Sequence, residues 1–245
     1  MSGMVHPSPT TSVKDLGFLL ASGNVSAFFI SLAFLRFALK RFPRKIMKRI
    51  HDGTSLKKLK WLSEDPNVTV VFQDEVHFTV ESTITRQWFP KGSCPKVRSY
   101  PGRKSVAYSG FVIPETGQLF TVKPEWFNFE TTIESIRKFI ASVDLPEGKK
   151  VCLIMDNAPW HKKAKRLIES EDEYADLREI LTLISMPPYS PDLNPIEQVW
   201  RVTRREKTHN RYWSGLPSLT AVLDEWFTAF SIPNRKLSSL CSFTW

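Results

Sequence analysis

The stretch KKVCLIMDNAPWH, residues 149–161, decides the fold of this chain. Its centre, VCLIM at 151–155, is an unbroken apolar run, which is typical of a strand that is buried on both faces. A second run of this kind, LTLISM, lies at 181–186, and helix-like sequence precedes each run. Because buried strands that alternate with helices lie parallel in the centre of a sheet, the stretch predicts an α/β fold.

Upstream of this stretch the sequence predicts an antiparallel meander. A β-branched run, VTVVFQD, spans 68–74, and further β-rich runs lie at 83–89, 105–113 and 118–122. The run at 83–89 ends in the turn signal Pro-Lys-Gly, and the last run is entered through Glu-Thr-Gly. Connections this short join neighbouring strands, so we expect three or four antiparallel strands.

Between the meander and the buried runs the period of the apolar residues changes. Isoleucine and phenylalanine recur at spacings of three and four residues, which predicts an amphipathic helix over 130–143. The element order is therefore meander, helix, strand, helix, strand, helix. We expect a mixed sheet, an antiparallel meander plus parallel strands, flanked by helices.

Three carboxylates stand at the ends of the predicted elements. Asp74 closes the first strand run, and Asp156 follows VCLIM directly. Glu197 lies in PPYSPDLNPIEQVW, where Pro195 suits the first turn of a helix and Asn194 its N-cap. If the central strands adjoin, both aspartates project from one edge of the sheet, and the helix brings the glutamate over them. Three such carboxylates repel one another at neutral pH unless cations bind between them.

Hard oxygen ligands of this kind suit Mg²⁺ or Mn²⁺, and two such ions can activate the attacking oxygen and stabilise the leaving oxygen of a phosphodiester. Each acid also has a structural alternative. An aspartate at a strand end is often a turn former, and Glu197 could be only a capping-box partner. Asp192 could replace Glu197 as the third ligand, whereas Glu75 should point to the side of the strand opposite Asp74.

Three motifs carry a resemblance to a known family. FQDE at 72–75, MDNAPWH at 155–161 and PPYSPDLNPIEQVW at 187–200 resemble the three acidic motifs of DDE transposases from bacterial and archaeal insertion sequences, in the mariner-like superfamily. The stretch QWFPKG at 87–92 resembles the strand and turn that follow the first acid in such enzymes. The resemblance covers about residues 61–213.

This resemblance implies a ribonuclease H-like fold on which Asp74, Asp156 and Glu197 are the metal-binding catalytic triad. It also implies a Mg²⁺- or Mn²⁺-dependent enzyme, with two ions, that cleaves and transfers strands at insertion-sequence ends. Its expected partners are the DNA of the element ends and of the target, bound by a homo-oligomer. A truncated remnant that keeps the fold and binds DNA weakly is the alternative, because residues 1–60 show no recognisable helix-turn-helix pair.

Polar and basic residues follow the second and third acids and are candidates for phosphate contacts. The candidates are Asn157, His161, Lys162 and Lys163 after Asp156, and Arg201 and Arg204 on the helix that carries Glu197. A structural turn is the alternative role for Asn157, and a solvated helix face is the alternative for the basic residues.

The net charge of +9 comes from a short part of the chain. Residues 36–60 hold ten Lys and Arg against a single acid, whereas 61–245 hold 23 of each sign. A run this basic suits a polyanion such as DNA or a membrane surface, with a solvated linker as the alternative.

Residues 16–35 carry no charge over a length close to the roughly 20 residues that span a bilayer. Serine and asparagine interrupt the run, so we expect a buried or partner-facing helix. A spanning helix, and with it a membrane-tethered nuclease, is the alternative, as is a poorly folded segment. The three cysteines lie far apart and the start of the chain does not fit a secretory signal, so we expect a cytoplasmic, nucleoid-associated protein without a membrane partner.

Composition and motifs together divide the chain into four segments. They are a disordered tail at 1–12, an apolar helix with a basic segment at 13–60 that could be a degenerate DNA-binding region, the α/β domain at 61–213, and a C-terminal helix with a tail at 214–245.

Overall fold

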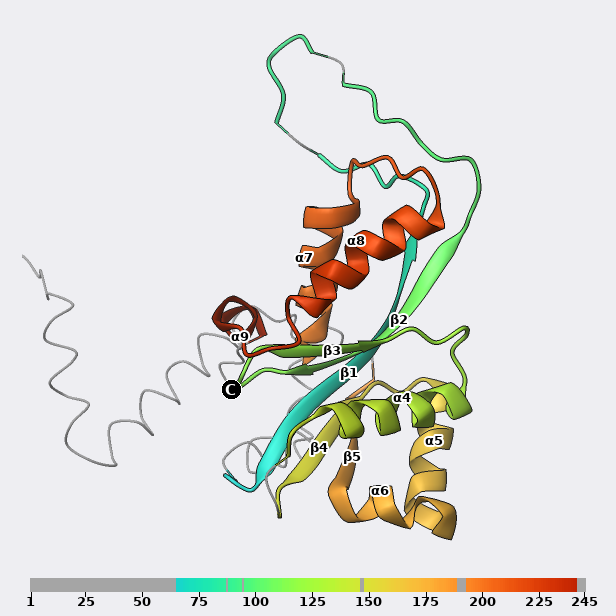
Figure 1. Cartoon of the computed structure of the whole chain (residues 1–245), viewed down its shortest axis with the longest axis vertical. Helices are drawn as coiled ribbons and strands as arrows, with labels where there is room; N and C mark the ends of the chain where they lie inside the picture. Colours follow the sequence, from blue (N-terminus) through green and yellow to red (C-terminus); the bar gives the residue numbers. More distant parts are fainter. Residues whose placement is uncertain (1–64, 87, 94, 146–147, 189–192, 242–245) are drawn as a thin grey trace, which may run out of the picture. The chain divides into compact units, whose positions relative to one another are not determined.

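The described strands form one mixed sheet in the order β3-β2-β1-β4-β5 (Figure 1). β1 (Val68–Thr79), β2 (Ser105–Ile113) and β3 (Gln118–Val122) pair antiparallel. β4 (Lys150–Met155) and β5 (Leu181–Ser185) continue the sheet from β1 in parallel. The predicted mixed sheet, a meander joined to parallel strands, is confirmed.

The computed structural model describes residues 65–241, apart from 87, 94, 146–147 and 189–192. The predicted tail at 1–12 and the apolar and basic segments at 13–60 therefore lie outside the described residues, as does Asp192. Within the described part, no helix has both the length and the apolar character that crossing a membrane requires.

β1 is longer than the sequence predicted, because it does not end at Asp74. It pairs with β4 only from Val68 to Phe72, but its pairing with β2 continues to Thr79. The apolar side chains of Val76 and Phe78 keep the two-residue alternation and are buried, so the strand still has a face to bury after the aspartate. Asp74 therefore lies inside β1, just beyond the part that pairs with β4.

Of the three or four antiparallel strands that the sequence predicted, the described residues form three, and the run at 83–89 is not the fourth. These residues belong to a long connection between β1 and β2 that projects from the sheet (Figure 1). Its apolar side chains are exposed, Ile84 by 78% and Trp88 by 102%, so the β-rich composition there marks no buried face. The predicted turn that follows is confirmed by Gly92 at φ +86° and by the bond from the Ser93 N–H to the Pro90 carbonyl.

Helices cover both faces of the sheet. The helices on one face are α4 (Phe129–Ser142), α5 (Pro159–Ser170) and α6 (Ala175–Ile180), with a 3₁₀ turn at Asp172–Tyr174. The other face carries α7 (Ile196–Thr203), which runs into a π-helical turn at Arg204–Thr208, and α8 (Leu216–Thr228). The predicted helix at 130–143 is thus confirmed as α4, which begins with a capping box made by Asn128 and Thr131.

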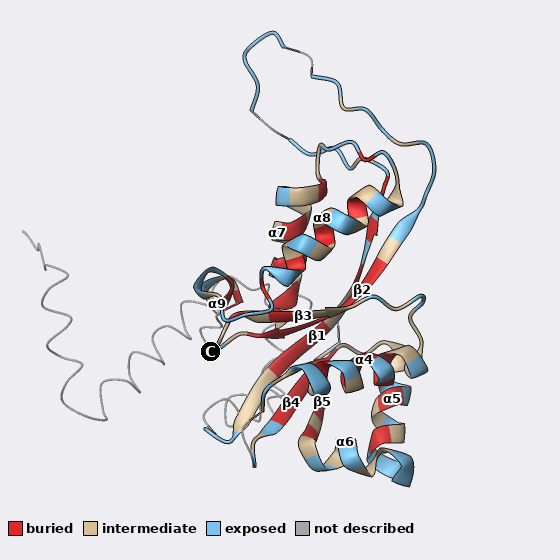
Figure 2. Cartoon of the chain, in the orientation of Figure 1, coloured by how far each residue is buried: buried red, intermediate tan, exposed pale blue. Residues whose placement is uncertain are grey.

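Each face of the sheet has its own core, and Figure 2 shows in red where buried residues lie along the strands and helices. Under α4 and α5 the core is mostly aliphatic, with Phe111 stacked on Phe139 at 4.6 Å between ring centroids. Under α7 and α8 it is aromatic, with Phe78, Trp200 and Phe227 in edge or tilted contacts.

The C-terminal part has two helices where the sequence predicted one. α9 (Arg235–Cys241) follows α8 and packs against α7. The turn between β2 and β3 lies against the start of α9, and only a glycine fits there. Gly117 has φ +70°, and a Cβ on it would collide with the Asn234 carbonyl.

Candidate functional site

Asp74 lies in the middle of β1 on the face that α7 covers, at a half-buried position. Its Oδ2 accepts a hydrogen bond of 3.0 Å from the Trp200 indole Nε1–H. Burial raises the pKa of this carboxyl to about 7, and the negative charges of Glu197 and, less strongly, Asp156 act in the same direction. The site therefore holds a carboxylate whose charge no nearby base compensates.

Glu197 comes to this site from the first turn of α7, as the sequence predicted. The predicted N-cap is wrong, because the helix begins at Ile196 and no side chain caps it. The Asn194 side chain is buried and instead donates from its amide to the Gln73 carbonyl, at 3.5 Å. This bond ties the entry to α7 to the strand residue beside Asp74, which explains why the side chain is not free to cap the helix.

Asp156 follows β4 directly and occupies the corresponding place on the neighbouring strand. The last registered pair of β1 and β4 is Phe72 with Ile154, and each aspartate stands two residues beyond it. The Oδ1 atom of Asp156 accepts hydrogen bonds from the Ala158 N–H at 2.9 Å and from the His161 Nδ1 at 2.5 Å. The bond to the histidine lowers the pKa of Asp156. Both bonds fall on Oδ1, so Oδ2 takes neither of them.

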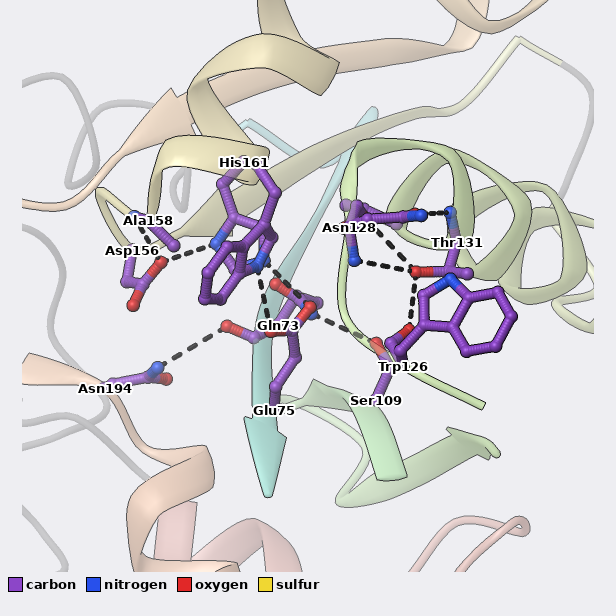
Figure 3. A network of polar contacts seen from close by, with 12 residues as sticks. Gln73, Glu75, Ser109, Trp126, Asn128, Thr131, Asp156, Ala158, His161 and Asn194 are labelled. Carbon is purple, nitrogen blue, oxygen red and sulfur yellow. Dashed lines mark hydrogen bonds and ion pairs between the residues drawn. The ribbon is translucent and has the colours of Figure 1, made fainter. Parts of the chain in front are cut away.

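His161 bridges Asp156 to a second acid, Glu75 (Figure 3). Its side chain is 3% exposed, and its Nε2 lies 3.2 Å from the Glu75 Oε1. The other oxygen of Glu75 accepts a bond of 2.9 Å from the Trp160 indole. Burial lowers the pKa of His161, but the bonds to the two carboxylates outweigh it and raise this pKa to about 9. The imidazolium form thus joins the two acids across β1 and β4.

The sequence predicted part of this arrangement. Glu75 does point away from Asp74, towards α5 rather than α7, as strand alternation predicted. The role of Glu75 as a support for His161 was missed, and so was the Trp200 bond to Asp74. The available signals were the acid directly after Asp74 and the Trp-His pair in the first turn of the helix after Asp156.

The residues that the sequence predicted to contact phosphate have different surroundings in the structure. Asn157 donates from its amide to the Met186 carbonyl, which joins the ends of β4 and β5 and agrees with the structural alternative. Lys162 and Arg201 are exposed. Two further cations lie over rings: the Lys163 ammonium is 3.4 Å from the Phe129 ring centroid and the Arg204 guanidinium is 5.5 Å from that of Phe78. Phosphate contact by these residues stays a prediction.

The donor set fits a hard divalent cation. The negative charge of Glu197 acts on Asp74, and Asp156 has a carboxylate oxygen outside its bonds to His161 and Ala158. Carboxylate oxygens are the ligands that Mg²⁺ and Mn²⁺ prefer. Among the described residues, no group of three or more Asp, Glu, His or Cys side chains is arranged so that it could hold a metal ion as it stands. Metal binding would therefore need side-chain movement at the site.

Comparison with known proteins shows which family this chain resembles. Residues 69–220, more than half of the chain, match the sequence model of the family described as "DDE superfamily endonuclease". A curated relative, the uncharacterized protein y4pE/y4sA of Sinorhizobium fredii (strain NBRC 101917 / NGR234), is 31% identical over 102 residues, which are 42% of this chain and 67% of the relative.

Solved structures of Mos1 share the fold. The Mos1 mariner paired end complex with Mn matches with a TM-score of 0.58 at 17% identity, over 82% of this chain and 60% of that chain. The Mos1 strand transfer complex matches with a TM-score of 0.56 at 18% identity over the same shares. The chain thus spans about 60% of the length of these Mos1 chains. The strand order and these matches together confirm the predicted ribonuclease H-like fold.

Proposed function

Because the chain belongs to the family of DDE superfamily endonucleases, we propose that it is a DNA transposase, which cuts insertion-sequence ends and joins the freed strand to target DNA. The observation that carries the proposal is the place of Asp74. It stands in the middle of β1, at the position that corresponds to Asp156 after β4, and Glu197 from α7 adds uncompensated negative charge. If these acids had no function, apolar side chains at the same positions would make the fold more stable.

In this proposal Asp74, Asp156 and Glu197 hold two Mg²⁺ or Mn²⁺ ions. When bound, such ions activate the attacking oxygen and stabilise the leaving oxygen at a phosphodiester. The residues of the chain then have separate tasks. The aspartates bind from the sheet, which fixes their spacing, and Glu197 binds from a helix. His161 and Trp200 each hold one of the aspartates by a ring N–H.

DNA is the proposed partner, and the described chain has basic residues that follow the second and third acids. Lys162 and Lys163 lie near the start of α5, which follows Asp156. Arg201 on α7 and Arg204 in the π-helical turn follow Glu197. Phosphate contacts from these residues would release counterions. A homo-oligomer that holds two ends is the proposed assembly, supported by the paired-end complexes that the related Mos1 fold forms. We place the activity on DNA in the cytoplasm, at the nucleoid.

The test is cleavage of duplex DNA that carries the inverted repeats flanking the coding sequence, with Mg²⁺ or Mn²⁺. Asp74→Ala, Asp156→Ala and Glu197→Ala should each abolish cleavage and leave the circular dichroism spectrum unchanged. Glu179→Ala is the matched control, because Glu179 is an exposed acid on α6. Cleavage that survives in any one of the three variants contradicts the role of that acid. A wild-type chain that binds the DNA but cuts none would be the truncated remnant.

The basic run at 36–60 can be tested separately, although it lies outside the described residues. If it binds phosphates, the affinity of the full chain for duplex DNA should fall with salt more steeply than that of the 61–245 fragment. The two log-log slopes should differ by about 0.9 for each phosphate that the run neutralises. Equal slopes would assign the binding of DNA to α5 and α7.

A further inference from the structure

Trp200 joins two of the proposed metal ligands through one helix. It lies three residues after Glu197 on α7, is 1% exposed, and donates from Nε1 to the Oδ2 of Asp74 at 3.0 Å. The helix that carries one acid therefore also carries a hydrogen-bond donor to another. Any shift of α7 along β1 would move both the glutamate and the indole relative to Asp74.

The Trp200 indole fits beside β2 because the strand has a glycine, without a side chain, at that point. Gly110 pairs with Asp74 in the register of β1 and β2. A Cβ on Gly110 would lie 2.6 Å from the Trp200 Cζ2 and 3.0 Å from the Ile196 Cδ1, closer than side chains approach. The six-membered ring of Trp200 thus occupies the space of the missing side chain directly beside the acid.

Aromatic neighbours close the other sides of this position. Phe78 meets the Trp200 ring edge-on, with centroids 6.4 Å apart and planes at 77°. Phe227 of α8 meets it at 5.9 Å and 79°. A ring enclosed in this way cannot turn to another acceptor, so its N–H keeps one direction.

From this geometry we propose that Trp200 is a positioning residue: its indole N–H fixes the orientation of the Asp74 carboxylate for divalent-cation binding, and Gly110 is required to seat it. The inference rests on the proposed function, since it assigns Asp74 as a ligand. Packing alone would be served by any aromatic ring, whereas a donor at 3.0 Å directs one carboxylate oxygen. Partners of this kind typically change metal affinity by about 10- to 100-fold when they are removed.

The decisive variant is Trp200→Phe, which keeps a ring in the site and removes the N–H. Mn²⁺ binding to the DNA-free protein, measured by calorimetry, should weaken about tenfold or more. Cleavage should fall at low Mn²⁺ and recover most of its rate at saturating Mn²⁺. In a ¹H–¹⁵N spectrum of the wild type, the indole signal that this variant lacks should shift when Mg²⁺ is added.

Trp226→Phe is the matched control. The Trp226 indole also donates a bond of 3.0 Å, but to the Thr203 hydroxyl rather than to an acid, and it packs edge-on against Phe230. This variant should lose thermal stability without a change in Mn²⁺ affinity. If Trp200→Phe behaves in the same way, Trp200 serves only packing and the proposal is overturned. If the wild type itself binds no Mn²⁺ and cuts no DNA, the proposed function fails first.

A second variant tests the seat of the indole. Gly110→Ala should displace the Trp200 ring, so it should weaken Mn²⁺ binding and lower the melting temperature. In the Trp200→Phe background the same substitution should lower the melting temperature much less, because phenylalanine lacks the Cζ2 and Cη2 atoms that the new Cβ meets. Equal effects of Gly110→Ala in the two backgrounds would show that the glycine makes no room for Trp200.

Discussion

Asp74 and Asp156 occupy equivalent places on neighbouring parallel strands, yet the structure holds them in opposite ways. Each stands two residues beyond the last registered pair of β1 and β4. Asp74 accepts a hydrogen bond from an uncharged indole, and its pKa is raised to about 7, chiefly by burial and also by the charge of Glu197. Asp156 faces His161, and the hydrogen bond to this histidine lowers its pKa. The two carboxylates hold equivalent positions relative to the sheet, but their surroundings shift their pKa values in opposite directions.

This difference indicates where a cation has most to gain. α5 brings a compensating imidazole to Asp156, whereas α7 brings Glu197 to Asp74 and adds to the repulsion. Binding of Mg²⁺ should therefore relieve more unfavourable energy at the Asp74 side of the site than at the Asp156 side. Asp156, already ionised and fixed, would act as a preformed ligand.

The largest expected effect on stability comes from removing the compensating group. His161→Ala leaves Asp156 and the nearly buried Glu75 without their shared partner, so the free energy of unfolding should fall by roughly 3–5 kcal/mol. Urea unfolding at pH 7 measures it. His77→Ala is the control, because this histidine is exposed on the same strand as Glu75. Similar small losses in both variants would show that His161 does not compensate the two acids.

At Asp74 we expect a substitution to raise the free energy of unfolding, whereas His161→Ala should lower it. Asp74→Asn should abolish cleavage and yet stabilise the metal-free protein at pH 8, because it removes a buried charge that no base compensates. The asparagine carbonyl can still accept the bond from Trp200. Each pH unit between the folded and unfolded pKa corresponds to about 1.4 kcal/mol, so we expect a gain of roughly 2–4 kcal/mol in EDTA.

The stability that Asp74→Asn gains over the wild type should increase as the pH rises. The pKa of Asp74 is 3.8 in the unfolded reference and about 7 in the fold. The stability that the protonated carboxyl provides is complete below pH 3.8 and is lost as the pH rises through 7. Wild type and Asp74→Asn should therefore unfold alike near pH 4 and diverge up to pH 8. Asp156→Asn, which weakens a bond to His161, should be destabilising at pH 8. If both asparagine variants were more stable than the wild type at pH 8, the two acids would not differ in how the fold compensates their charges.

Part of this site could be predicted from the sequence because local patterns determine it. The buried run before Asp156 gave a central strand, and parallel pairing then placed Asp74 beside it. What could not be predicted depends on contacts between distant segments. Glu75 meets His161 across 86 positions, and Trp200 fits beside Asp74 only because Gly110 on a further strand leaves space. The spacing of apolar residues within one segment does not show which residue of a helix will pack on which residue of a strand.

The same distinction explains the errors in the fold. β2, β3 and α4 were predicted within one residue because alternation or helical periodicity runs through each of them. The strand at 83–89 was predicted from composition, but its residues have no described strand beside them and stay exposed. β1 was predicted too short because Asp74 and Glu75 resemble a strand end. Their charges are accommodated inside the strand by partners from α5 and α7.

A smaller effect is expected from adding the cation. Mg²⁺ at ten times its dissociation constant should stabilise the wild type by about 1.4 kcal/mol at pH 8, since it binds the folded chain. At pH 5 the shift should be smaller, because Asp74 is then mostly protonated and the ion must displace the proton. Asp74→Asn should respond weakly at both values. Melting temperatures with and without Mg²⁺ measure this, and an equal response of the two proteins would place the bound ion elsewhere.

The smallest expected effect is a change in Mn²⁺ affinity, and it comes from a comparison of two indoles that each donate to a carboxylate. Trp160 donates to the Glu75 Oε2 at 2.9 Å, whereas Trp200 donates to the Asp74 Oδ2 at 3.0 Å. Trp160→Phe should lower the free energy of unfolding by about 1.5–3 kcal/mol, the usual contribution of one hydrogen bond to a charged group. Glu75 keeps its bond to His161, so Asp156 stays in place and Mn²⁺ affinity should change less than about twofold, compared with the tenfold or larger loss expected for Trp200→Phe. Calorimetric titration of both variants beside the wild type measures the difference. A large loss of Mn²⁺ affinity in Trp160→Phe would mean that the orientation of Asp156 depends on Glu75 as strictly as that of Asp74 depends on Trp200, and the two acids would then be held by equally rigid supports.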